Sequence, residues 1–156
     1  MLNEFLAVAV TSMLPIAEVR GGIPLGIMIF KLDPALTIAV SAITNTLVFF
    51  PVYFGLELFY ERFFIRFGWA RLLIERIHKK GKPMLDKYGI IGLAIFVGAP
   101  LPFTGAWTGT GIAWLFGLEW KKSFIVIAAG VLMAAAIVST VLLLGLTGLG
   151  IFVKQG

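Results

Sequence analysis

The sequence predicts an all-α integral membrane protein made of two inverted repeats, each a re-entrant helical hairpin broken by proline and glycine and followed by a transmembrane helix. The first reason is composition, because 60% of the 156 residues are hydrophobic and only 13% are charged, against about 25% charged in a soluble domain. The second reason is a pair of long segments without charge, and the third is that one order of features occurs twice. An apolar surface of this extent indicates a lipid environment.

The first repeat, residues 1–60, opens with an apolar block at 2–30 that Pro15 and Pro24 interrupt. Its first piece, 2–14, would form a helix about 20 Å long, which is too short for a hydrocarbon core of about 30 Å. The block is therefore either one broken helix that crosses the membrane or a re-entrant hairpin that enters and returns. Non-helical backbone at that depth is tolerated only inside protein or beside a water-filled cavity.

A polar turn at 31–34 ends this block, because its proline disfavours helical geometry for the residue before it. The 21 residues 36–56 then carry no charge, and about 20 apolar residues span a bilayer core. We therefore expect a transmembrane helix at 36–58, kinked by Pro51. The polar residues inside this helix are expected to form interhelical hydrogen bonds rather than to bind a ligand: Thr44, Asn45 and Thr46.

Residues 61–87 interrupt the apolar pattern with eight basic and three acidic side chains. Apolar residues recur within the segment at helical spacing, which predicts a basic amphipathic helix lying at the level of the lipid headgroups. Basic residues are enriched on the cytoplasmic side of membrane proteins. The segment is therefore expected to be a cytoplasmic linker between the two repeats.

The second repeat, residues 88–153, is predicted to hold a hairpin at 89–118 and a transmembrane helix at 123–147. The hairpin block has no charged residue, and the polar residues 119–122 separate it from the helix. A shift of 87 positions places the prolines, glycines and polar turn of the first repeat on those of the second. Few residues are identical, so the order of the features carries the relationship.

The topology depends on how each broken block enters the membrane. If both blocks are re-entrant hairpins, each repeat crosses once and the two repeats are inverted. If both blocks cross, the repeats are parallel. The inverted arrangement places ten basic residues on one side and two on the other, against nine and three for the parallel one, and the positive-inside rule favours the more uneven distribution. In both arrangements 61–87 is cytoplasmic and both termini lie outside.

Glu18 and Arg20 lie near the middle of the first broken block, whose third charged residue, Glu4, is near its start. A charge at membrane depth costs several kcal/mol unless it is paired or hydrated, and such residues commonly serve transport. The carboxylate could exchange a proton and the guanidinium could bind an anion, or the two could form a salt bridge that only holds the loop. We expect a helix break between Pro15 and the run Gly21-Gly22-Ile23-Pro24. The candidate substrate- or ion-binding residues of this first loop are Pro15, Glu18, Arg20, Gly21, Gly22 and Pro24.

The corresponding stretch of the second block, 98–111, has no charge but offers threonine hydroxyls, an indole N–H and backbone groups beside glycines. Loops of this kind coordinate ions or polar groups in transporters, whereas the alternative is that the glycines serve only close helix packing. In transporters, binding sites lie where paired broken helices meet, so the pairing of this stretch with the first loop favours ligand binding over a packing role alone. The candidate residues here are Pro100, Pro102, Thr104, Gly105, Trp107, Thr108, Gly109 and Thr110.

The sequence contains no cysteine and one histidine, His78, so thiolate and histidine-only metal sites are excluded within one chain. It contains no nucleotide-binding fingerprint and no histidine in either apolar block. We therefore expect no catalytic residue, no metal and no cofactor, and a protein that is not an enzyme. The net charge of +5 follows from basic residues placed at a membrane surface, so no nucleic-acid partner is expected.

The two loops resemble those of the small multi-drug export protein family and, more distantly, of the DedA superfamily. The residues that carry the resemblance are Pro15, Glu18, Arg20, Gly21, Ile23, Pro24 and Gly26, together with Pro100, Pro102, Thr104, Gly105, Trp107 and Gly109. The resemblance implies inverted re-entrant hairpins and either transport driven by a proton or ion gradient or flipping of an anionic lipid carrier. DedA proteins carry arginines in the second loop where this chain has Ala99 and Gly105, so Arg20 would supply the cation.

We thus expect a multi-pass cell-membrane protein, either a transporter or a lipid flippase-like protein, with its site between the two loops. Two spanning helices and two hairpins are too few to enclose a pathway, so a homo-oligomer, most simply a homodimer, is expected. The alternatives are a structural or assembly protein and, less favoured, a membrane enzyme.

The topology can be tested by single cysteines, because the chain has none of its own. A cysteine at position 78 is expected to react with a membrane-impermeant maleimide only from the cytoplasm. Cysteines at Lys31 and Lys121 are expected to react from opposite sides. Labelling of both from one side would show that the repeats are parallel and that the hairpin model is wrong.

Overall fold

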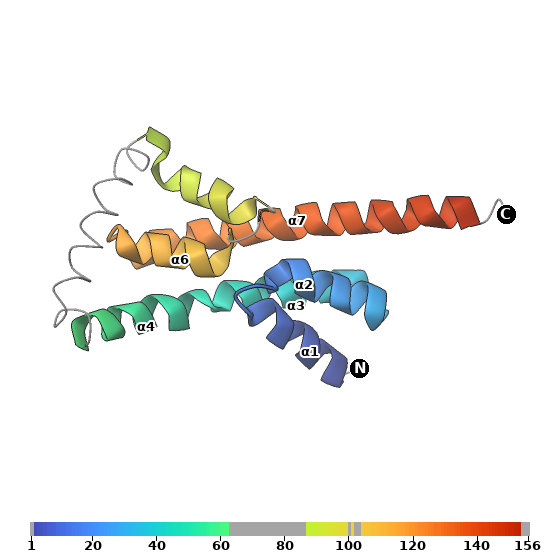
Figure 1. Ribbon diagram of the computed structural model, residues 1–156, viewed down its shortest axis with the longest axis horizontal. Coiled ribbons are helices and arrows are strands. Elements are labelled where there is room, and N and C mark those ends of the chain that lie inside the picture. Colours follow the sequence, from blue (N-terminus) through green and yellow to red (C-terminus); the bar gives the residue numbers. More distant parts are fainter. Residues whose placement is uncertain (1, 63–86, 100, 102–103, 154–156) are drawn as a thin grey trace.

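The computed structural model describes residues 2–62, 87–99, 101 and 104–153 (Figure 1). These residues form helices joined by turns, with no strand among them, which confirms the predicted all-α class. The predicted linker at 61–87 lies almost wholly outside the described residues.

The first apolar block forms two antiparallel helical pieces. Helix α1 (Leu2–Met13) ends at a turn at 14–17, and α2 (Glu18–Pro24) continues directly into the π-helical turn η1 (Leu25–Ile29). The expected helix break after Pro15 is this turn, but it ends before Glu18, and the whole Gly-Gly-Ile-Pro run is helical within α2. Pro24 has no N–H to donate to the carbonyl one turn earlier, and directly after it the helix widens into η1, closed by a bond from the Phe30 N–H to the Leu25 carbonyl (3.1 Å).

The long helix that follows starts at a cap. Asp33 accepts a hydrogen bond from the Leu36 N–H (2.9 Å), and Pro34 occupies the first turn, where its missing N–H costs nothing. Helix α3 (Pro34–Leu47) is separated from α4 (Phe49–Arg62) by a turn at Val48. This interruption lies one turn before Pro51, where the proline ring removes a backbone hydrogen bond. Together, Pro34–Tyr60 are long and apolar enough to cross a membrane.

The second half repeats this order. A helix at Lys87–Gly98 leads through residues 99–105 to α6 (Ala106–Leu115), and a turn at 116–119 leads to α7 (Trp120–Val153). Gly117 has φ of +62°, a left-handed conformation that glycine adopts readily. Within α7, Trp120–Gly145 form the second segment long and apolar enough to cross a membrane.

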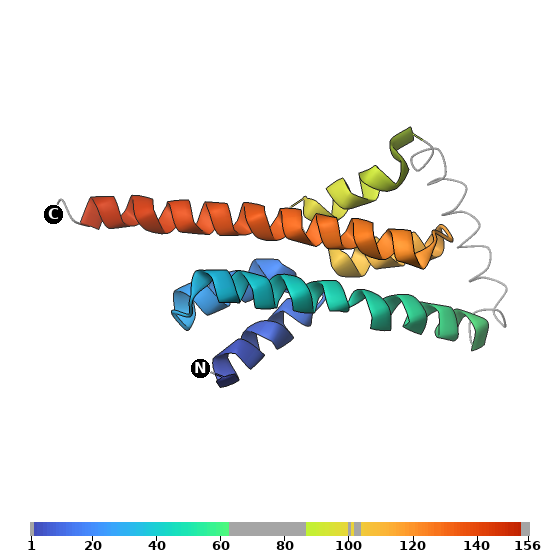
Figure 2. The same ribbon diagram turned by 180° about the vertical axis from the view of Figure 1, so that it is seen from behind.

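The two helix pairs approach the middle of the molecule from opposite ends. Helix α1 runs from one end to the middle, where the chain turns and α2 returns, while the helix Lys87–Gly98 starts at the other end and α6 returns there (Figure 1). The view from behind shows the same arrangement (Figure 2). The long helices α3–α4 and α7 extend along both pairs, with α2 packed against α7 and α6 against α4. The loops of the two halves therefore meet near the centre.

The burial pattern of the two halves refines the predicted shift of 87. That shift holds for α2 and α6, where Glu18, Val19 and Gly22 correspond to Gly105, Ala106 and Gly109, all buried. In the first helices of the pairs the buried positions recur at a shift of 85, and in the long helices at 86. The connecting loops of the two halves differ in length, so a single shift cannot describe the whole chain.

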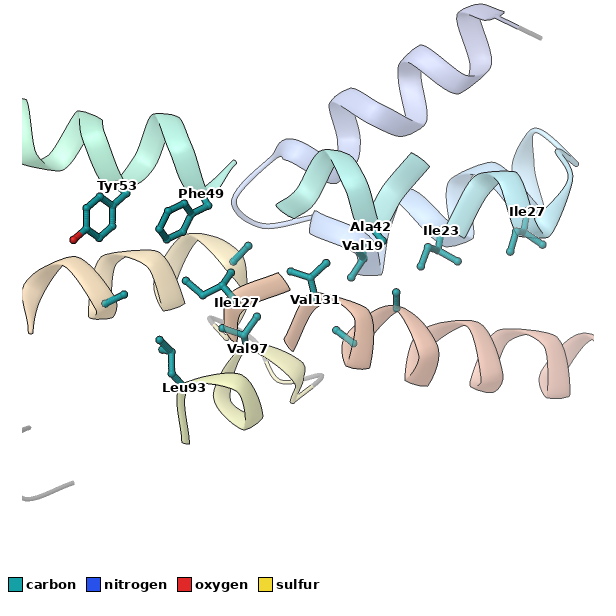
Figure 3. Packing of buried hydrophobic residues seen from close by; sticks show 14 residues of the cluster. Val19, Ile23, Ile27, Ala42, Phe49, Tyr53, Leu93, Val97, Ile127 and Val131 are labelled. Carbon is teal, nitrogen blue, oxygen red and sulfur yellow. The ribbon is translucent and has the colours of Figure 1, made fainter. Parts of the chain in front are cut away.

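One apolar core joins the two halves. Figure 3 shows Phe49 and Tyr53 of α4 on one side of it and Ile127 and Val131 of α7 on another. Phe49 is fully buried and stacks on Tyr53 with ring centroids 5.2 Å apart. The Tyr53 hydroxyl donates to the Leu118 carbonyl (2.9 Å), which satisfies its polar group. Many large apolar side chains remain exposed, as a lipid-facing surface requires.

The helix Lys87–Gly98 packs on α7 at a glycine. A Cβ added to Gly130 would lie 2.8 Å from the Ala94 carbonyl oxygen and 2.6 Å from the Cβ of Val97. One neighbour is a backbone atom and the other is a Cβ fixed to the backbone, so neither can move unless the helix backbone moves with it. By contrast, a Cβ on Gly55 in α4 would meet nothing within 4 Å.

We predict that Gly130→Ala lowers the free energy of unfolding by about 1–3 kcal/mol, because the two helices must separate. The matched variant Gly55→Ala should leave stability unchanged or raise it by up to about 1 kcal/mol, since alanine favours helix. Thermal melting of the purified protein in detergent measures both. Equal melting temperatures for the two variants would contradict the close packing at Gly130.

Candidate functional site

The first loop brings a buried carboxylate to the middle of the molecule. Glu18 has φ of +48°, a left-handed conformation that costs a non-glycine residue about 1–3 kcal/mol. Its side chain is only 4% exposed, although it lies on the short helix that follows the turn at 14–17. Strain and burial of a charge at one residue indicate that the surrounding structure compensates for both.

The compensation comes from the start of α6. The backbone N–H of Trp107 donates to Glu18 Oε1 (3.3 Å), and the N–H of Ala106 also donates to this carboxylate. These N–H groups form the positive end of the helix dipole and have no partner within their own helix. A Cβ at position 105 would overlap the Glu18 carboxylate, so Gly105, with φ of +155°, permits this approach.

Arg20 serves the opposite helix end. Its Nη2 donates to the carbonyls of Ala99 (2.8 Å) and Thr104 (2.6 Å) and to Thr104 Oγ1 (3.0 Å), and its Nη1 donates to the Leu101 carbonyl. The carbonyls of Ala99 and Leu101 lie just beyond the end of the helix Lys87–Gly98, where carbonyl groups lack helical partners. The flat, forked guanidinium can bond several of them at once. Arg20 thereby holds the second loop in place.

One further contact connects the loops, and another lies within the second loop. The indole N–H of Trp107 donates to the Met13 carbonyl at the end of α1 (2.9 Å). The Thr104 hydroxyl lies 2.6 Å from the Ala99 carbonyl and 2.8 Å from that of Leu101, to which it donates. Side chains of the first loop therefore donate hydrogen bonds to the second loop, and Trp107 donates one back to the end of α1.

Glu18 and Arg20 form no ion pair with each other in the part of the chain that the structure describes. The ion pair recorded there joins Lys122 and Glu119 at the exposed start of α7 (2.8 Å). Each of the two buried charges instead bonds to the backbone of the second loop, the carboxylate at the start of one helix and the guanidinium at the end of another. If the two charges stabilise the fold, they do so by connecting the two loops. They do not form the salt bridge within the first loop that the sequence suggested.

The structure brings five of the candidate residues into one contact network and leaves the others outside it. The five are Glu18, Arg20, Thr104, Gly105 and Trp107. Pro15 is exposed in the first turn, Thr108 is exposed on α6, and Gly21 and Pro24 lie within α2 away from the recorded contacts. Gly22, Gly109 and Thr110 are buried in helix packing. Pro100 and Pro102 lie outside the described residues.

Several partners in this network could not be identified from the sequence. The carbonyl groups of Met13, Ala99 and Leu101 accept bonds from side chains of the other loop. Every residue carries a carbonyl, so only the path of the backbone decides which ones are free. Ser12 and Ser41, which face Gly22 from α1 and α3, could have been noticed as serines within apolar stretches.

Two segments long and apolar enough to cross a membrane indicate a membrane location for this chain. The chain belongs to the family described as "Putative small multi-drug export protein", whose profile matches residues 18–137. This range begins at Glu18, directly after the turn at 14–17, and includes the second loop. No curated protein and no solved structure matches the chain, and the DedA resemblance gains no support of its own.

We predict that Arg20→Lys lowers the free energy of unfolding by about 1.5–3 kcal/mol, the usual value of hydrogen bonds to a charged group. Lysine keeps the charge but lacks the fork that bonds several carbonyls at once. Melting of the purified protein checks this, with Lys121→Arg at an exposed position as the control. Wild-type melting of Arg20→Lys would show that the bonds to Ala99, Leu101 and Thr104 contribute little.

Proposed function

We propose that this protein is a coupled membrane transporter whose site lies between its two central loops. The observation that carries the proposal is the network in which Glu18 and Arg20 reach from the first loop to the backbone of the second. A purely structural contact at this depth could be apolar and would avoid the cost of burying charge. The family name supports transport in general.

We further propose that the two helix pairs are re-entrant hairpins that enter the membrane from opposite sides. Helix α1 has 12 residues, about 18 Å at 1.5 Å per residue, and cannot span the hydrocarbon core. The two pairs start at opposite ends of the molecule and turn near its middle (Figure 1). In this multi-pass arrangement the segment 61–87 is cytoplasmic, as its basic residues favour.

Glu18 is the proposed proton carrier. When ionised, its carboxylate holds the start of α6 through hydrogen bonds to an anion, which are about twice as strong as neutral ones. Protonation weakens these bonds and the attraction to the helix dipole. The start of α6 is then free to move away from the first loop. A proton would thus control whether the two loops are joined, which couples its passage to that of a substrate.

The substrate proposed for this site is an anion, either a small molecule or the head group of an anionic lipid. Once Glu18 is neutral, the N–H groups of Ala106 and Trp107 lack their negative partner, and the start of a helix favours a negative charge. Arg20, in the same network, adds a fixed positive charge. The lipid version of this proposal is flippase-like activity.

A structural or assembly role is the second candidate, and the bonding of Arg20 favours it. Both terminal nitrogens of the guanidinium already donate to protein oxygens, three of them backbone carbonyls. In that case the two charges only hold the hairpins together. The proposal contains no catalytic step and treats the protein as a non-enzyme. A homodimer is proposed because two spanning segments alone cannot enclose a pathway.

The two candidates differ in what Glu18→Gln does. In proteoliposomes with an internal pH indicator, an inward gradient of inorganic phosphate is expected to change the internal pH with wild-type protein. Glu18→Gln should reduce this change at least about tenfold, as expected when a proton carrier is lost. The control is Glu57→Gln, an exposed carboxylate on α4 outside the network.

Melting temperatures of the same samples complete this test. Loss of the pH change with near wild-type melting supports the proton carrier. Retained pH change with a lower melting temperature would show that Glu18 is structural. Vesicles that contain a fluorescent phosphatidylglycerol distinguish lipid translocation from transport of free anions, because only lipid translocation moves the labelled lipid between the two leaflets.

A further inference from the structure

A second polar cluster lies where the end of α1 meets α2 and α3. Ser12 and Ser41 are fully buried and Asn45 is 1% exposed. The cluster is separate from the contacts of Glu18 and Arg20, which go to the second loop. It lies beside Gly22, two residues after Arg20 on α2. Buried polar side chains in an apolar chain need partners.

Two hydroxyl oxygens face one point in this cluster, and a buried amide lies one helical turn away. A Cβ on Gly22 would overlap Ser12 Oγ and lie 3.0 Å from Ser41 Oγ, so the two hydroxyls face the same point on α2. Asn45 follows Ser41 by one helical turn on the same face, and helical side chains lean toward the preceding turn. Its Nδ2 donates to the Ser12 carbonyl (2.7 Å), which ties the amide to the same cluster.

Two of these oxygens have no partner. Asn45 Oδ1 and Ser41 Oγ are buried without a hydrogen bond. Other hydroxyls in these helices donate to the carbonyl four residues earlier, as those of Ser12, Thr37, Thr44, Thr46 and Thr110 do. Ser41 does not follow this pattern, although the same bond is the ordinary one for serine in an apolar helix. The unpartnered oxygens indicate a missing ligand.

The local charge favours a cation. Ser12 is in the last turn of α1, the negative end of the helix dipole, and that turn contains no basic residue. The nearby guanidinium of Arg20 is directed to the carbonyls of the second loop. The cluster itself contains neutral oxygens and no carboxylate. Divalent cations are normally bound with carboxylates, so a monovalent cation fits this set better.

We propose that Ser12 Oγ, Ser41 Oγ and Asn45 Oδ1 form part of a binding site for a monovalent alkali cation, taken to be Na⁺. Oxygen ligands at the C-terminal end of a short helix are a recurrent way of holding Na⁺ in transporters. The inference deepens the proposed function, on which its role as a coupling ion rests. The cation would hold α1, α2 and α3 together directly behind the helix that carries Glu18 and Arg20.

The second half does not contain an equivalent site. By the correspondence of buried positions in the long helices, Ser41 matches Ile127 and Asn45 matches Val131. The first helix of the second pair places Val97 where Ser12 stands. These residues belong to the apolar core. One Na⁺ per chain is therefore expected, not two.

The test measures binding of radioactive ²²Na⁺ to the purified full-length protein in detergent, with choline replacing Na⁺ at constant ionic strength. Wild-type protein is expected to bind one Na⁺ per chain. Ser41→Ala and Asn45→Val, the second of which copies the residue at the matching buried position, are each expected to weaken binding at least tenfold. Ser123→Ala, which removes another buried and unpartnered hydroxyl on α7, should bind as wild type does.

Absence of saturable ²²Na⁺ binding by folded wild-type protein would overturn the proposal, and so would unchanged affinity in Ser41→Ala. If Asn45→Val fails to fold, Ser41→Ala and Asn45→Asp decide, because the added carboxylate of Asn45→Asp should tighten binding. Binding in detergent involves no flux, so its failure leaves the phosphate-driven pH change of the wild-type protein intact. Loss of that pH change alone would count against transport and not against the cation site.

Discussion

The arrangement of the two central loops depends on how two opposite charges are stabilised inside an apolar protein. Glu18 and Arg20 form no ion pair with each other, and each bonds instead to the free end of a short helix, one offering N–H groups and the other carbonyl groups. A short helix ending in the middle of the molecule creates unsatisfied backbone groups that lipid cannot bond. The charged side chains and the free helix ends are therefore each other's hydrogen-bond partners, and each would be unsatisfied without the other.

This mutual dependence explains why the second loop needs no charge of its own. Gly105 removes the side chain that would keep the carboxylate away from α6, and Thr104 adds a hydroxyl to the bonds around the guanidinium. The two halves have thus taken complementary roles at corresponding positions, with Glu18 matching Gly105. In the mechanism we propose, this contact is strong while Glu18 is ionised and weak when it is neutral, so a proton would control a two-state element.

The long helices show the same divergence. The first half buries Ser12, Ser41 and Asn45 between α1, α2 and α3, whereas the matching positions of the second half are the apolar residues Val97, Ile127 and Val131. Close glycine packing, as at Gly130, fixes the second hairpin on α7. The first hairpin instead packs around polar atoms, two of which lack partners.

The sequence alone determined the helical class, the two spanning segments and the two pieces of each broken block, because apolar length and polar turns are local properties. It also identified Glu18 and Arg20, since a charge in an apolar block is visible without a structure. It placed a helix break after Pro15, where the turn at 14–17 lies, but it could not show that Gly21–Pro24 are helical, because tertiary packing overrides the low helix propensity of glycine and proline. Only the tertiary structure decided which partners the charges have, since those partners are backbone groups 79 to 89 residues away that no side-chain pattern marks.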